Sequence, residues 1–148
     1  MNTIPILEAF GNAPPRSPCV LCIPGPGGGT DMILTEWFSW LNIKRNPMLS
    51  FSLPRSAAFG PALREGDRFV LAFPPENLAR GYKQGLRLTA EDLEKKPGFL
   101  TPESLPAAVP VGSAVALSCT LAGAYNYPFK NIRIFNCNLE DALGEAAE

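Results

Sequence analysis

The chain has 148 residues and a net charge of −1, and 46% of its residues are hydrophobic whereas 18% are charged. A chain of this length folds as one domain that buries roughly 70% of its unfolded surface, so it can form a core without disulfides or a structural metal. Its apolar runs are shorter than the roughly 20 residues of a membrane-spanning helix, and residues 1–10 lack the features of a secretory signal. We therefore expect a single cytoplasmic domain over residues 1–148 that does not enter the membrane.

Two features of the composition exclude several classes of function. Lys and Arg are scattered along the chain, whereas nucleic-acid binding depends on clustered positive charge. The chain has no histidine, so a Ser-His-Asp triad, a histidine general base and most catalytic zinc sites are excluded. Any chemistry is more easily assigned to a bound cofactor that the protein positions.

Short apolar runs between prolines and glycines predict a mainly β domain with short helices. Residues 18–24 predict a strand, and the glycine-rich residues 24–30 predict a hairpin turn. A phosphate loop is disfavoured at this turn because the third glycine of GxGxxG and the Lys-Ser/Thr ending are both missing. The apolar segment 31–42 contains Trp37, Phe38 and Trp40, which either stack on a flat ligand or fill the core.

The middle of the chain alternates between apolar and polar residues. Residues 48–53 place Leu49, Phe51 and Leu53 on one face and serines on the other, as in a half-buried strand. The remaining expected elements are helices at 54–65, 75–84 and 90–96, the last with a capping box at 89–92, and strands at 68–73, 113–123 and 131–139. The core is thus expected within residues 18–139, followed by an acidic segment, 140–148, that forms a short surface helix or a frayed tail.

Four cysteines raise the question of a metal or redox site. Cys19 and Cys22 form a CxxC, but Cys119 and Cys137 lack a matching spacing, so no metal site is predicted. Redox CxxC pairs usually open a helix, whereas this pair lies on a predicted strand, where residues three apart point to opposite faces. We interpret the cysteines as inert buried thiols; the alternative is a thiol-redox protein that uses Cys19 and Cys22.

The best candidate for an anion site follows the strand at 48–53. Ser50 and Ser52 share one face of this strand, Arg55 follows where the strand ends, and Ser56 can cap the next helix. A helix N-terminus beside a guanidinium suits a phosphate monoester. The alternative is a solvated arginine with an ordinary N-cap serine.

The order of these segments resembles the flavin reductase-like family, which includes the flavoredoxins. The resemblance rests on Asp-Met-Ile-Leu-Thr-Glu-Trp at 31–37, Asn-Pro-Met-Leu at 46–49, and Ser-Leu-Pro-Arg-Ser-Ala-Ala-Phe at 52–59. It continues with Arg-Glu-Gly-Asp-Arg-Phe-Val-Leu at 64–71, Gly-Phe-Leu-Thr-Pro at 98–102 and Ser-Cys-Thr at 118–120.

This resemblance implies an FMN-binding split barrel, Greek-key-like, that forms a homodimer with a flavin near each subunit interface. The implied function is that of an FMN-dependent oxidoreductase or electron carrier, with NAD(P)H or a redox protein as electron donor. Residues 34–37 would approach the isoalloxazine largely through their backbone, and the segment after residue 51 would hold the ribityl phosphate. The candidate cofactor-binding residues are Leu34, Thr35, Glu36, Trp37, Ser50, Ser52, Leu53, Arg55, Ser56 and Phe59.

Three positions depart from the family pattern and motivate an alternative function. Leu34 aligns with the family's threonine, Ala58 stands where a Ser or Thr follows the arginine, and Lys130 ends a segment that replaces a Gly-Asp-His stretch. The alternative is a non-catalytic split barrel that has lost flavin and serves as a binding or assembly module.

Overall fold

The structure is a computed structural model that describes residues 1–12, 18–41, 45–56, 63–128 and 130–144. Its strands are β1 (Asn2–Ile4), β2 (Cys19–Pro24), β3 (Thr30–Thr35), β4 (Phe38–Leu41), β5 (Met48–Pro54), β6 (Arg68–Ala72), β7 (Leu86–Leu88), β8 (Phe99–Leu100), β9 (Val109–Pro110), β10 (Val115–Asn126) and β11 (Ile132–Gly144). Its helices are α1 (Ile6–Asn12), α2 (Glu76–Ala79) and α3 (Ala90–Lys95), with 3-10 turns η1 (Pro26–Gly28) and η3 (Arg80–Tyr82).

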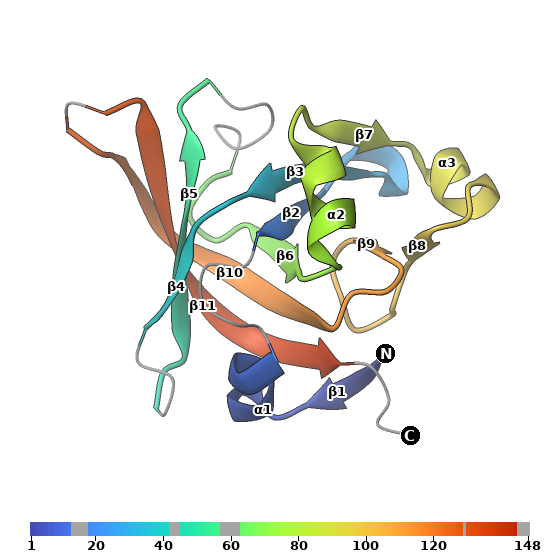
Figure 1. Cartoon of the computed structure of the whole chain (residues 1–148), viewed down its shortest axis with the longest axis horizontal. Coiled ribbons are helices and arrows are strands. Elements are labelled where there is room, and N and C mark those ends of the chain that lie inside the picture. The colour runs from blue at the N-terminus through green and yellow to red at the C-terminus, as the bar shows by residue number, and fades with distance from the viewer. Residues whose placement is uncertain (13–17, 42–44, 57–62, 129, 145–148) are drawn as a thin grey trace.

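The main sheet is antiparallel and closes on itself as a barrel (Figure 1). Its strand order is β4-β5-β11-β10-β6-β2-β3-β7, and β1 adds to β11. β3 and β4 lie toward opposite ends of this order, yet only Glu36 and Trp37 separate them in the chain. Where the chain turns from β3 into β4, the Ser52 N–H donates to the Trp37 carbonyl at 3.4 Å. We call this meeting of residues 35–37 with the end of β5 the seam.

β2 is buried on both of its faces because the barrel has a second apolar layer outside it. Cys19 and Leu21 belong to the inner cluster, in which Phe51 stacks on Phe135 with ring centroids 5.0 Å apart. Val20 on the opposite face belongs to an outer cluster. The outer cluster is completed by residues of α2, of β7, of the segment before β9 and of β9 itself: Ala79, Leu88, Leu105, Ala107, Ala108 and Val109. The expected mainly β barrel with short helices is confirmed.

Most of the predicted elements are confirmed at their expected places. The strands at 18–24, 48–53 and 68–73 correspond to β2, β5 and β6, and a turn containing η1 occupies the glycine-rich segment. The helix predicted at 75–84 divides into α2 and η3, and that at 90–96 is α3. The capping box is present: the Asp92 N–H donates to the Thr89 hydroxyl at 3.1 Å, and the Thr89 N–H donates to the Asp92 carboxylate at 3.0 Å.

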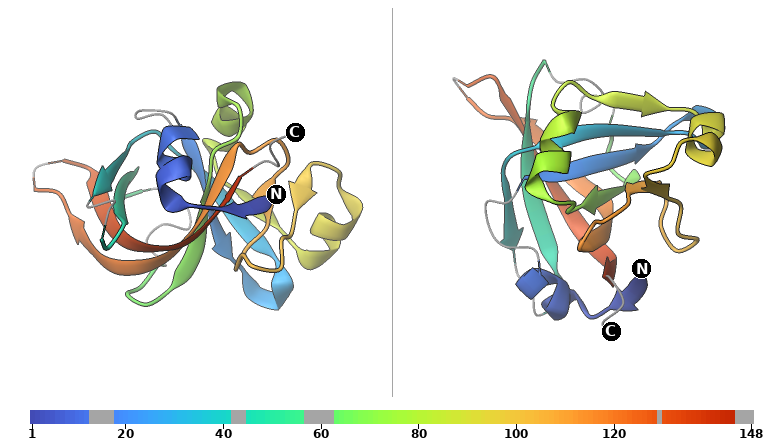
Figure 2. Two further views of the ribbon diagram at one scale, coloured as in Figure 1. Left: turned by 90° about the horizontal axis from the view of Figure 1, so that it is seen from below. Right: turned by 45° about the vertical axis from the view of Figure 1, so that its right-hand side comes forward.

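The chain ends differ from the prediction. Residues 140–144 form neither a helix nor a tail but the last part of β11: residues 141–144 pair with β10, and residues 142–144 also pair with β1. Residues 145–148 lie outside the described residues. β1 and α1, which the sequence analysis missed, lie at the end of the molecule away from β7 and α3 (Figure 2). Of the helix expected at 54–65, residues 57–62 lie outside the described residues, and the described residues at both ends are not helical: Pro54 ends β5, and residues 55–56 form a turn.

Among the described helices, none has the length and apolar character required to cross a membrane.

Candidate functional site

A pocket of about 510 Å³ lies at the seam, within the roughly 300–1,000 Å³ that is usual for small-molecule sites. Its walls come from β3 and the β3–β4 turn, the end of β5, the segment after η3, and the start of β11. The described lining residues are Ile33, Leu34, Thr35, Glu36, Trp37, Ser52, Leu53, Pro54, Ser56, Lys83, Gln84 and Ile132.

One wall of the pocket is a strand edge with which no strand among the described residues pairs. β7 pairs with β3 only at residues 30–32, so residues 33–35 are paired on one side, by β2. In an antiparallel strand alternate residues direct their N–H and C=O groups to each side. The free side of β3 therefore offers backbone donors and acceptors to the edge of a planar ligand.

Thr35 stabilises the seam through a hydrogen bond from its buried side chain to the backbone. Its side chain is buried, and its hydroxyl lies 2.8 Å from the Ser52 carbonyl and 3.2 Å from the Trp37 carbonyl, to which it can donate its one proton. Leu34 is also buried and packs in the outer cluster. The family's threonine hydroxyl is thus absent at Leu34, and the neighbouring Thr35 uses its own to bond the protein backbone.

The three aromatic residues of this segment divide between core and pocket. Phe38 is buried and contacts Phe73 edge to face, with ring centroids 5.1 Å apart. Trp40 is partly buried and packs against the inner cluster. Trp37 is 44% exposed and lines the pocket. Of the two alternatives left open by the sequence, the core therefore holds Phe38 and Trp40, whereas Trp37 is available to a flat ligand.

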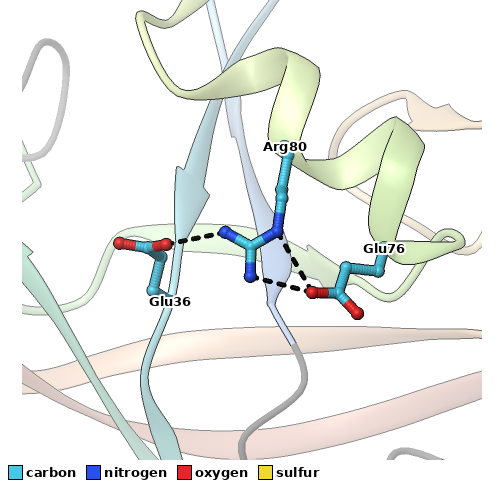
Figure 3. A network of polar contacts seen from close by, with 3 residues as sticks. All are labelled: Glu36, Glu76 and Arg80. Carbon is cyan, nitrogen blue, oxygen red and sulfur yellow. Dashed lines mark hydrogen bonds and ion pairs between the residues drawn. The ribbon is translucent and has the colours of Figure 1, made fainter.

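The carboxylate of Glu36 at the pocket is held by an arginine (Figure 3). Arg80 Nη1 lies 2.9 Å from Glu36 Oε1, and Arg80 Nη2 lies 2.8 Å from Glu76 Oε1. The hydrogen bonds that Arg80 donates to Glu76 and then to Glu36 raise the pKa of its guanidinium. This network joins α2 and η3 to the β3–β4 turn, and Arg80 offsets part of the negative charge of Glu36.

The predicted anion site on β5 is only partly brought to the pocket. Ser52 and Ser56 line it, whereas Ser50 is buried and donates a hydrogen bond to Asn136 Oδ1. Arg55 is exposed and is not among the described lining residues; its backbone N–H donates to the Asn131 carbonyl at 3.1 Å. Phe59 lies outside the described residues.

The sequence analysis missed Lys83 and Gln84 as pocket residues. They follow η3 and reach the pocket because this segment packs beside β3. A short helical segment in the sequence carries no signal for which strand it will meet.

Neither family models nor curated proteins match this chain, but solved structures do. BorF, the flavin reductase component of a bacterial two-component tryptophan halogenase, has a TM-score of 0.70 and 16% identity over 96% of this chain and 88% of its own. The NADH:FAD oxidoreductase SgcE6 of Streptomyces globisporus C-1027 has a TM-score of 0.69 and 15% identity over 93% and 80%. Flavoredoxin from Methanosarcina acetivorans has a TM-score of 0.65 and 18% identity over 88% and 69%.

The chain has the split-barrel fold of the flavin reductases. This confirms the fold expected from the resemblance at 31–37, 46–49 and 52–59.

The seam pocket of this split barrel fits a flavin in its chemistry. Trp37 supplies an exposed aromatic face, the free edge of β3 supplies backbone donors and acceptors, and Ser52 and Ser56 supply hydroxyls. Lys83 supplies a positive charge for an anionic tail. Aromatic surface with a few convergent polar groups is the usual composition of a cofactor site.

The thiols lie away from this pocket. All four cysteines are free and buried, with Cys19 in the inner cluster and Cys22 in the outer one. Burial raises the pKa of Cys19, of Cys22 and of Cys119. The expected burial of the thiols is confirmed, whereas their inertness stays a prediction. Within the described residues, no three His, Cys, Asp or Glu side chains are grouped to hold a metal ion.

Proposed function

We propose that the chain binds FMN in the seam pocket and acts as an oxidoreductase or electron carrier of the flavin reductase and flavoredoxin type. The observation that carries this proposal is the pocket itself. It combines an exposed tryptophan, a free strand edge, two hydroxyls and a cation, and it lies in a barrel with the flavin reductase fold. A bound flavin supplies hydride and electron transfer, so the protein has to bind it, orient it and control access to it.

The lining residues divide these tasks. We assign contact with the ring system to the backbone of residues 34–36 and the indole of Trp37. We assign the ribityl tail and its phosphate to the end of β5, where Ser52, Leu53 and Ser56 line the pocket and Arg55 stands between two lining residues. Proton transfer by a side chain is not required: histidine is absent, and Glu36 is held by Arg80.

A nicotinamide nucleotide is the proposed electron donor, and a second copy of the chain is the proposed partner. A flavin reductase of this fold, HpaC, is known in complex with NADP+, and SgcE6 with NAD and FAD fragments. Trp37 and Ile132 leave apolar surface exposed at the pocket, and a second copy laid over it would shield a bound cofactor from water. A cytoplasmic location, where nicotinamide nucleotides are abundant, is part of the proposal.

The test begins with the absorbance spectrum of the purified protein and titrations with FMN, FAD and riboflavin. We expect a yellow protein, or one that quenches the fluorescence of added FMN, and bleaching of bound FMN by NADH or NADPH without oxygen. Trp37→Ala should weaken FMN and riboflavin alike, by about tenfold, because both present the same ring to the indole.

A colourless protein that binds none of the three flavins would contradict the proposal. If such a protein were still a stable dimer, the non-catalytic binding or assembly module would be the better description. The observation that favours this second function is Leu34, which packs in the outer cluster and offers the pocket no hydroxyl.

A further inference from the structure

Lys83 is the one cationic side chain among the described residues that line the seam pocket. Its side chain is exposed, and it makes no ion pair with any residue that the structure describes. It therefore differs from Arg68, Arg80, Arg87, Lys95 and Lys96, each of which pairs with a carboxylate.

Arg80, in the adjacent 3-10 turn η3, is a nearby cation that does form ion pairs. It lies three residues before Lys83, but its guanidinium bonds both Glu36 and Glu76 (Figure 3). Its single positive charge is shared between these two carboxylates, so it offsets only part of the negative charge of Glu36, the carboxylate that lines the pocket. An anion entering the pocket therefore meets the positive charge of Lys83, while Arg80 reduces the repulsion from Glu36.

The backbone at Lys83 is held in place on both sides. Its N–H donates to the Arg80 carbonyl at 3.3 Å, and the preceding residue, Tyr82, packs against the outer cluster. Gly85, with a φ of 83°, then ends the helical segment, and its N–H donates to the Tyr82 carbonyl at 3.0 Å. A fixed backbone directs a flexible side chain to one region of the pocket.

We propose that Lys83 binds the terminal phosphate of FMN, together with the hydroxyls of Ser52 and Ser56, and so makes the pocket selective for phosphorylated flavin over riboflavin. This inference rests on the proposed function. An ammonium group is a compact charge with three donors and needs no fixed planar geometry. The two hydroxyls, which line the same pocket from the end of β5, can complete the set of donors.

The test compares FMN and riboflavin binding by calorimetry for the wild type, Lys83→Met, Lys83→Arg and Lys95→Met. We expect Lys83→Met to weaken FMN about tenfold or more and to leave riboflavin unchanged, because only FMN carries the phosphate. Lys83→Arg should retain most of the FMN affinity. Lys95, which pairs with Glu91 on α3 and does not line the pocket, is the matched control and should change neither affinity. Added salt should weaken FMN less in Lys83→Met than in the wild type.

Two results would overturn the assignment of Lys83 while leaving the proposed function intact. One is Lys83→Met with unchanged FMN affinity, especially if Arg55→Ala loses FMN selectively, since the phosphate would then lie with Arg55 alone. The other is an equal loss of FMN and riboflavin in Lys83→Met. A wild type that binds neither flavin would instead overturn the proposed function and this inference with it. Because Lys83 is exposed, its variants should melt at the wild-type temperature, which circular dichroism checks.

Discussion

Thr35 shows that a residue expected at a ligand can serve the protein instead. The resemblance placed it beside a flavin, and it does line the pocket, but its hydroxyl is 2.8 Å from the Ser52 carbonyl. That bond joins the end of β3 to the end of β5, which are remote in the strand order of the sheet. The shape of the pocket therefore depends on the hydrogen bond from Thr35 to Ser52, which no local sequence pattern predicts.

We predict that Thr35→Val lowers the free energy of unfolding by about 1–3 kcal/mol, because the part-buried Ser52 carbonyl loses the hydroxyl donor of Thr35. The same variant should weaken FMN binding, since the β3–β4 turn is no longer held against β5. Urea unfolding and FMN titration measure the two effects. Thr35→Ser keeps the hydroxyl and serves as control; equal stability of the Val variant and the wild type would contradict the prediction.

At the scale of elements, the structure explains why the turn between β2 and β3 is rich in glycine. A Cβ at Gly29 would stand 2.4 Å from the Leu88 carbonyl oxygen, and one at Gly28 would meet Ala90 at 3.6 Å. The turn therefore packs closely against the end of β7 and the start of α3. This close approach explains Gly29, and positive φ values of 67° and 85° explain Gly27 and Gly28. These glycines therefore need no phosphate ligand, in agreement with the predicted hairpin turn.

We predict that Gly29→Ala destabilises the protein by about 1–3 kcal/mol, because backbone must shift to admit the new methyl group. Gly81→Ala is the matched control: its Cβ would have no heavy atom within 4 Å, and its backbone is helical. It should leave stability unchanged or raise it by about 0.4–1 kcal/mol. Thermal or urea unfolding of both variants decides the matter, and a Gly29→Ala protein as stable as Gly81→Ala would count against the packing argument.

Local patterns predicted the elements that local forces determine. The alternation at 48–53 and the capping box at Thr89 required no knowledge of distant residues. Residues 140–144 were misassigned because an acidic, alanine-rich segment favours a helix locally, whereas the folded chain pairs Leu143 with Thr3. For the same reason the pocket was only half predicted: its β3 and β5 walls are marked in the sequence, but Lys83 is placed there by tertiary packing.

Across the whole molecule the four cysteines share one environment, the apolar interior. They sit in the inner and outer clusters, and burial raises the pKa of each thiol for which a shift is resolved. A raised pKa disfavours the reactive thiolate at neutral and mildly alkaline pH.

We predict that none of the four thiols reacts quickly with Ellman's reagent at pH 8 in the native protein, and that all four react after unfolding in urea. Native labelling should follow the rate of unfolding rather than the reagent concentration. The unfolded protein is the control for total thiol content. Rapid modification of Cys19 and Cys22 in the native state would revive the thiol-redox alternative.

The burial of β2 on both faces requires apolar side chains of suitable volume, but not particular residue types. Val20 faces one cluster and Leu21 the other, yet neither makes a contact that another aliphatic side chain of similar volume could not supply. A strand enclosed in this way tolerates exchange of its members provided that each replacement is apolar and fits the space. This is why barrels of 14–18% identity can superpose over most of the chain. The fold depends on which positions are buried and apolar, and the identity of the residue at each such position can vary.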